Sequence, residues 1–165
     1  MQGSAELATD AKESAVNDNL DELKQRVKDN PHDATAHLDY GIALGEVHRF
    51  NEAVCEFEQV VELDPESVDG HYNLGVIYGK CLLEDLAIDE LWEDHSDEEI
   101  LFENALHHYK IAFDLNSTCV AALNNLGHLH AVRGCIGEAR EYFLKSLEID
   151  PDQAGIRDDL AELEE

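Results

Sequence analysis

Three short proline turns recur along the chain, and their spacing constrains the fold more than any other feature. The turns read Asn-Pro-His-Asp, Leu-Asp-Pro-Glu and Ile-Asp-Pro-Asp and contain Pro31, Pro65 and Pro151. The first two prolines lie 34 residues apart, and the third follows 86 residues later, which is two periods of 34 with 18 residues added. A fixed period of this length is typical of stacked helical repeats. We therefore predict three repeat units, with an insertion of 18 residues in the second.

Each unit also repeats a glycine in its first half and an alanine–aromatic pair in its second half. The glycines are Gly41, Gly75 and Gly127. The pairs, each spaced by four residues, are Ala53–Phe57, Ala105–Tyr109 and Ala139–Phe143. Because glycine costs about 1 kcal/mol relative to alanine inside a helix, its recurrence indicates a close helix crossing. The pattern predicts two helices per unit, packed closely against each other.

These landmarks resemble the tetratricopeptide repeat family, whose 34-residue helix-turn-helix unit carries large, Leu-Gly, aromatic, Ala, aromatic and Pro positions at fixed offsets. The units would be residues 34–67, 68–119 with the insertion at about 79–104, and 120–153. The resemblance implies an all-α fold, a right-handed superhelical stack of antiparallel helix pairs (a TPR solenoid) with an elongated helical hairpin in repeat two. Composition agrees, because Ala, Leu, Glu and Asp dominate while the chain has only three prolines and ten glycines.

The segments outside the three units are expected to close the array. Residues 1–17 are polar and acidic without strong periodicity, so we expect a flexible N-terminus. Residues 18–33 show apolar side chains at helical spacing and end at Asn-Pro, which predicts an N-terminal helix. Residues 154–165 carry one apolar stripe among acidic side chains, as expected of a C-terminal capping helix.

Four positions depart from the family pattern. His37 and His71 take the first large-residue position, His130 takes an aromatic position, and Ser117 stands where proline would close repeat two. Stacked repeats share one core and tolerate local defects. Because a buried neutral histidine needs a hydrogen-bond partner, we expect the three histidines to be half-exposed or hydrogen-bonded.

The insertion predicts that both helices of repeat two run on beyond the repeat body. Ser96 followed by Glu99 has the form of a capping box, which would start the second helix after an acidic turn. Trp92, the single tryptophan, lies near the tip of the hairpin. An exposed Trp92 would form an interaction patch, and a Trp92 folded back would seal the tip.

In the family, the first helices line a concave groove, and the repeat phase assigns the residues that face it. The expected binding residues, together with Trp92 on the hairpin, are Leu38, Tyr72, Asn73, Asn124, Asn125 and His128. Asn73 and Asn125 are the sharpest candidates, because an amide can donate and accept at once, although asparagine is also simply frequent at this position. Family members that capture acidic chaperone tails use Lys and Arg here. This chain has Leu38, Ile42 and Ala121 instead, so that function is not expected.

The charge balance bears on the partner. The chain has 38 acidic and 11 basic residues and a formal net charge of -27. Nucleic acid is excluded as an expected partner, because its binding requires clusters of Lys and Arg. The acidic field favours a basic protein or peptide, and the alternative is that it serves solubility, for instance in a high-salt cytoplasm.

Four cysteines without a C-x-x-C pair indicate a reduced, cytoplasmic compartment, and neither a leader nor a long apolar stretch is apparent. Secretion and membrane insertion are therefore not expected. Nine histidines accompany many carboxylates, most densely at 94–99, but their spacings do not match zinc sites, and no nucleophile motif is present. We expect no metal, no cofactor and no enzymatic activity.

The leading interpretation is a non-catalytic scaffold or adaptor that binds a peptide or helix in the concave groove, with the repeat-two hairpin as a second contact surface. The alternative is a structural homo-oligomer assembled through repeat stacking or through the hairpin.

Overall fold

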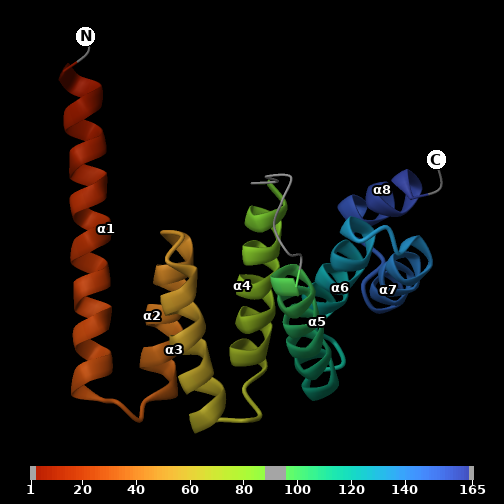
Figure 1. Cartoon of the computed structure of the whole chain (residues 1–165), viewed down its shortest axis with the longest axis horizontal. Coiled ribbons are helices and arrows are strands. Elements are labelled where there is room, and N and C mark those ends of the chain that lie inside the picture. The colour runs from red at the N-terminus through yellow and green to blue at the C-terminus, as the bar shows by residue number, and fades with distance from the viewer. Residues whose placement is uncertain (1–2, 88–95, 164–165) are drawn as a thin grey trace. The chain divides into compact units, whose positions relative to one another are not determined.

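The computed structural model describes residues 3–87 and 96–163, which form eight helices and contain no strand. The chain divides into two units, Met1–Pro65 and Glu66–Glu165. Within each unit, consecutive helices pack as antiparallel pairs (Figure 1). The predicted all-α fold built from helix pairs is confirmed.

The first unit contains α1 (Gly3–Asp29), α2 (Ala34–Glu46) and α3 (Phe50–Leu63). Helix α2 packs against both α1 and α3. Asp33 caps α2 by accepting a hydrogen bond from the backbone N–H of Thr35 at 3.0 Å. The buried side chains of this unit include Leu20, Tyr40, Leu44, Phe57 and Val60.

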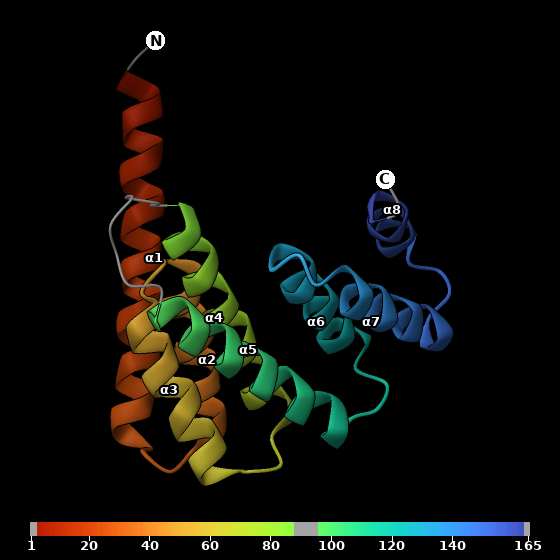
Figure 2. The same ribbon diagram turned by 45° about the vertical axis from the view of Figure 1, so that its right-hand side comes forward.

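The second unit contains α4 (Val68–Ala87), α5 (Ser96–Leu115), α6 (Val120–Val132), α7 (Ile136–Ile149) and α8 (Ala154–Glu162). Helix α4 lies beside α5 and α6 beside α7, and α8 packs on α7 (Figure 2). Helix α5 also packs on α6, so the two pairs share one core. Its buried members include Leu82, Tyr109, Leu123 and Leu126.

The recurrent glycines mark the closest helix crossings, as the sequence predicted. A Cβ on Gly41, Gly75 or Gly127 would lie 2.7, 2.6 or 2.4 Å from an aromatic ring of the paired helix. The rings belong to Phe57, Tyr109 and Phe143. No side chain fits at these distances, so the glycines are required for the rings to reach the first helices.

The helices of repeat two are elongated, as predicted. Helices α4 and α5 have 20 residues each, whereas their counterparts in the other two repeats have 13 and 14. Glu99, one half of the predicted capping box, accepts a hydrogen bond from Arg133 on its carboxylate, and the box itself stays a prediction. Trp92 and the rest of the predicted hairpin tip lie outside the described residues.

Helix α1 begins at Gly3, whereas the sequence predicted a helix only from residue 18. That prediction required an apolar stripe, which residues 3–17 lack. The stretch nevertheless contains four Ala and two Glu, whose high intrinsic helix propensity does not depend on a stripe. The C-terminal helix α8 begins where predicted, at Ala154.

Repeat two ends without the proline of the family pattern, because the side chain of Asn116 stabilises the turn instead. The side chain of Asn116 accepts hydrogen bonds from the N–H of Thr118 at 3.1 Å and from its hydroxyl at 2.8 Å. Asp150 accepts from the N–H of Asp152 in the same way after repeat three. Such side-chain turns fix the chain reversal as a proline would.

A candidate binding groove on α4 and α6

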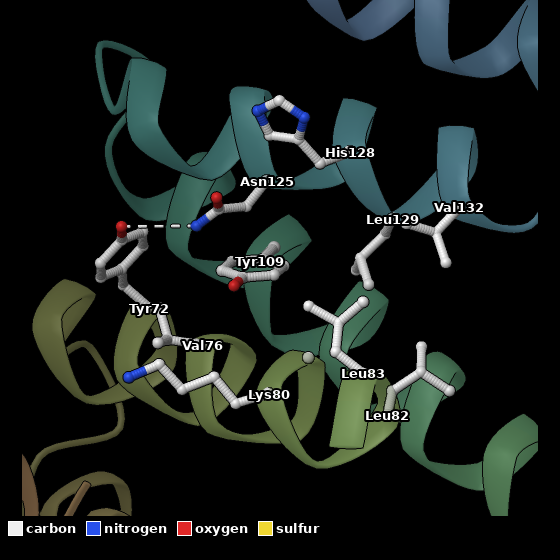
Figure 3. Close-up of a pocket in the computed structure, with 11 residues that line it drawn as sticks. Tyr72, Val76, Lys80, Leu82, Leu83, Tyr109, Asn125, His128, Leu129 and Val132 are labelled. Carbon is white, nitrogen blue, oxygen red and sulfur yellow. Dashed lines mark hydrogen bonds between the residues drawn. The ribbon is translucent and has the colours of Figure 1, made fainter. Parts of the chain in front are cut away.

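Helices α4 and α6 enclose a pocket of about 320 Å³ above α5 (Figure 3). Helix α4 contributes Tyr72, Val76, Gly79, Lys80, Leu82 and Leu83. Helix α6 contributes Asn125, His128, Leu129 and Val132, and Tyr109 comes from α5. Residues at helical spacing on two neighbouring first helices thus face one another, which is the arrangement expected of the groove.

The walls of this groove are mostly apolar, and none of the described residues that line it is acidic. Leu83 is 53% exposed and Val132 is 49% exposed, so apolar surface remains open to solvent beside the pocket. The chain has 38 acidic residues, and one of them, Asp159 on α8, lies beside His128 at the rim of the pocket. Large exposed apolar side chains gathered at a pocket are typical of a binding site.

A polar pair crosses the groove at one end. Asn125 Nδ2 donates to the Tyr72 hydroxyl at 3.4 Å, and the rings of Tyr72 and Tyr109 lie 5.9 Å apart (Figure 3). Tyr109 is buried, which raises the pKa of its hydroxyl strongly, and the neighbouring Tyr72 raises it further. The Tyr109 hydroxyl therefore stays protonated and available as a hydrogen-bond donor.

His128 stands at the rim of the pocket and contacts the C-terminal helix. Its Nε2 lies 3.6 Å from Asp159 Oδ2 on α8, and its ring meets the edge of Phe143 with centroids 5.0 Å apart. The imidazole is exposed on its remaining side. It can therefore reach a molecule bound in the pocket while the α8 carboxylate orients it.

Asn124, a predicted groove residue, is engaged within the protein instead. Its Nδ2 donates to Gln153 at 2.7 Å, and its Oδ1 accepts from the Ser146 hydroxyl at 2.5 Å. Gln153 in turn donates to the Ser146 hydroxyl at 2.9 Å and to the Asp150 carbonyl at 3.0 Å. The amide thereby ties α6 to α7 and to the start of α8, and we leave it out of the binding site.

The remaining predicted residues do not line this pocket. Asn73 donates to the Asp69 carbonyl of its own helix at 2.8 Å. Leu38 lies half-buried on α2 in the first unit, where Ile42 is 40% exposed. Trp92 falls outside the described residues. The pocket therefore combines three of the predicted residues, Tyr72, Asn125 and His128.

Sequence reasoning missed Gly79, Leu83 and Leu129. Leu83 lies in the elongated part of α4, beyond the last position that the repeat pattern assigns. The signal was present, since the stripe Tyr72, Val76, Gly79, Leu83 continues at spacings of three and four residues. Extending the helical stripe past the repeat boundary would have found it.

The histidines, cysteines and carboxylates do not gather into a metal site within the described residues. Across residues 3–87 and 96–163, no three of these side chains converge in a way that could hold a metal ion. The four cysteines are not disulfide-bonded. No helix in the described ranges is long and apolar enough to cross a bilayer.

Comparison with known proteins supports the family that the repeats suggested. Residues 49–80 match a model described as TPR repeat, and residues 120–153 match one described as tetratricopeptide repeat. The chain therefore carries tetratricopeptide repeats in these two segments. No curated protein matches it.

Solved structures of this class share its fold. MamA from Desulfovibrio magneticus RS-1 has a TM-score of 0.73 at 18% identity, with 93% of this chain and 76% of that chain covered. The thermophilic TPR protein TTC0263 of Thermus thermophilus has a TM-score of 0.72 at 21% identity, covering 98% and 80%. The second TPR domain of human RPAP3, solved with the HSP70 peptide SGPTIEEVD, has a TM-score of 0.65 at 16% identity, covering 80% and 95%.

Proposed function

We propose that this protein is a non-catalytic adaptor that binds a segment of a partner protein in the groove between α4 and α6. Tetratricopeptide repeats mediate protein–protein interactions, and the RPAP3 domain binds a peptide. The observation that carries the proposal is the pocket of about 320 Å³, lined mainly by apolar side chains and bordered by exposed Leu83 and Val132. An apolar side chain of the partner would be buried there, and such anchors dominate binding energy.

Backbone recognition would come from the polar end of the groove. The Asn125 amide contacts the hydroxyls of both Tyr72 and Tyr109, at 3.4 Å in the case of Tyr72, and its carbonyl oxygen would accept a hydrogen bond from the backbone of a peptide. The buried Tyr109 hydroxyl adds a donor on the pocket floor. One apolar anchor and one backbone contact would fix both position and direction of the bound segment.

Electrostatics favour a basic partner. The net charge of -27 attracts positive segments over the range of a Debye length, about 8 Å at physiological ionic strength. An acidic tail such as the EEVD end of the HSP70 peptide seen with RPAP3 would meet this repulsive field. Among the described residues that line the pocket, Lys80 is the single lysine or arginine. We therefore propose a partner with basic residues beside its apolar anchor.

The test is a selection of random peptides displayed on phage against the full chain, followed by titration of the best peptide by fluorescence anisotropy. Val132→Glu, inside the groove, should weaken binding at least about tenfold. Leu144→Glu is the control, because Leu144 is similarly exposed on α7 and does not line the pocket. Affinity should fall as salt rises if the partner is basic.

Equal losses from the two substitutions, or none from either, would overturn the groove proposal. The alternative of self-assembly is tested by light scattering on the same variants. A wild-type oligomer that Val132→Glu converts to a monomer would assign the groove to a second copy of the chain rather than to a separate partner.

A further inference from the structure

Helix α4 carries two buried glycines on successive turns, and the structure separates their roles. A Cβ on Gly75 would lie 2.6 Å from the Tyr109 ring, so internal packing requires that glycine. A Cβ on Gly79 would lie 3.8 Å from the Tyr109 hydroxyl and 3.9 Å from a Leu129 methyl group. Those are ordinary van der Waals distances. Internal packing therefore leaves room for a larger residue at Gly79.

The backbone does not require glycine at this position either. Gly79 lies inside α4, and the positive φ angles among the described residues occur at His48 and Gly134. The repeat phase equates Gly79 with Gly45 in repeat one and with Ala131 in repeat three, so the same helix position accepts alanine. Because glycine weakens a helix interior relative to alanine, some other property of Gly79 offsets that loss.

That property is access to the helix backbone from the pocket. Gly79 lines the pocket between Val76 and Leu83 on one side and Leu129 on the other. Without a Cβ, the main chain of α4 itself forms part of the pocket wall at Gly79. Glycine is the residue that permits close approach of a ligand to a backbone.

The molecule itself shows what fits on a bare first helix. Gly41, Gly75 and Gly127 each receive an aromatic ring from a paired second helix. Gly79 is one turn beyond Gly75 and lines the pocket, and the nearest atoms to its Cβ position are the Tyr109 hydroxyl and a Leu129 methyl group, not the face of a ring. Rings are also the anchors that bury the most apolar area at interfaces.

Building on the proposed function, we propose that an aromatic side chain of the partner packs on Gly79. The ring lies flat on the α4 backbone at Gly79, as Tyr109 does at Gly75, and Leu83 and Leu129 flank it. The partner segment therefore carries Phe, Tyr or Trp as its anchor, with basic residues beside it. Gly79 sets the specificity of the groove, since any side chain there would occupy the place of the ring.

The experiment compares Gly79→Ala with Gly137→Ala in the full chain. Gly137 lies in the first turn of α7, is exposed, and has nothing within 4 Å of its added Cβ. The probe is the best peptide from the phage selection described above. Gly79→Ala should weaken its affinity at least about tenfold, while Gly137→Ala should leave it within about twofold. The thermal midpoint of Gly79→Ala should equal or exceed that of wild type, which separates lost binding from lost folding.

The peptide supplies an independent measurement. Replacing its aromatic residue by leucine should weaken binding to wild type about tenfold and should change little on Gly79→Ala. Peptides that depend on Val132 but carry aliphatic anchors, or that bind Gly79→Ala as tightly as wild type, would overturn this inference and leave the groove function standing. Peptides indifferent to Val132→Glu would overturn the proposed function itself.

Discussion

Repeat one and repeat two place a buried histidine at the same position of their first helix and face it with different residues. The repeat phase equates His37 with His71, and it equates their partners Glu56 and His108 across the insertion. His37 Nδ1 lies 2.7 Å from Glu56 Oε2, and its Nε2 lies 3.2 Å from the Pro31 carbonyl. His71 Nδ1 lies 3.0 Å from His108 Nδ1. These histidines were predicted to be half-exposed or hydrogen-bonded, and both are buried and hydrogen-bonded.

The His37–Glu56 pair and the His71–His108 pair differ in how many protons they can hold. Both neighbours of His37 are acceptors, so a ring with protons on both nitrogens can donate at each of them. Between His71 and His108, one Nδ1 must donate and the other accept, so only a single proton fits in the contact. The pKa of His108 is lowered to about 4, chiefly by burial and further by His71 and His107. Tyr78 stacks on the other face of His108 with its centroid 5.9 Å away.

Repeat three gives the reference case, because the equivalent residues there are Leu123 and Tyr142. Leu123 is fully buried, and the ring of Tyr142 stacks on His130, with centroids 5.4 Å apart. His130 is half-buried, and its Nδ1 has no hydrogen-bond partner among the described residues. The fold therefore accepts a histidine–carboxylate pair, an imidazole pair or a leucine–tyrosine pair at one position. The residue on the second helix therefore determines how the stability of the repeat depends on pH.

The largest expected effect is a loss of stability in the second unit on acidification. Folded His108 titrates near pH 4 and unfolded histidine near 6.5, so its contribution is present above pH 6.5 and is lost as the pH falls toward 4. Allowing for its partial exposure, wild type should lose roughly 2 kcal/mol more than His108→Gln between pH 7.5 and 4.5. Urea unfolding at each pH measures the difference.

Hydrogen exchange gives an internal control for this prediction. Amides of α5, which carries His108, should exchange faster as the pH falls after correction for the intrinsic rate. Amides of α3, which carries Glu56, should change less. Identical pH profiles for wild type and His108→Gln would show that the imidazole pair does not govern acid stability.

Much of this comparison could be read from the sequence. The 34-residue period and the glycine–aromatic pairs predicted the helix pairs, because both patterns reflect packing that each repeat must satisfy. Counting past the insertion also aligns Glu56, His108 and Tyr142, so the differing partners were predictable in principle.

What the sequence could not show depends on side-chain geometry between distant elements. The Asn124 network requires the angle at which α8 meets α7, which no local pattern encodes. Gly79 looks like the packing glycines until distances from its missing Cβ are measured. The start of α1 was missed because helix propensity without an apolar stripe is a weak local signal.

A second prediction concerns the carboxylate of repeat one. Glu56→Ala should destabilise the first unit by about 1–2 kcal/mol at pH 7, because His37 would remain buried without its 2.7 Å partner. Glu58→Ala is the matched control, since Glu58 is exposed on the same helix and its substitution removes the same charge. Its effect should stay within about 0.5 kcal/mol. Equal unfolding free energies for the two variants would show that Glu56 does not support His37.

The smallest effect is expected when repeat two is given the pair of repeat three. His71→Leu alone leaves His108 Nδ1 without its 3.0 Å partner and should cost about 1–2 kcal/mol at pH 7.5. His71→Leu with His108→Tyr removes both imidazoles and restores the pair that repeat three packs at this position, so the double variant should lie within about 1 kcal/mol of wild type. The loss of stability on acidification that is predicted for wild type should be absent from the double variant, because no imidazole remains in the contact. A double variant less stable than His71→Leu would mean that the elongated helices of repeat two hold this position in a geometry that repeat three does not share. Urea unfolding of the complete mutant cycle at pH 7.5 and 5.5 distinguishes these results, since only a shared geometry makes the two substitutions compensate each other.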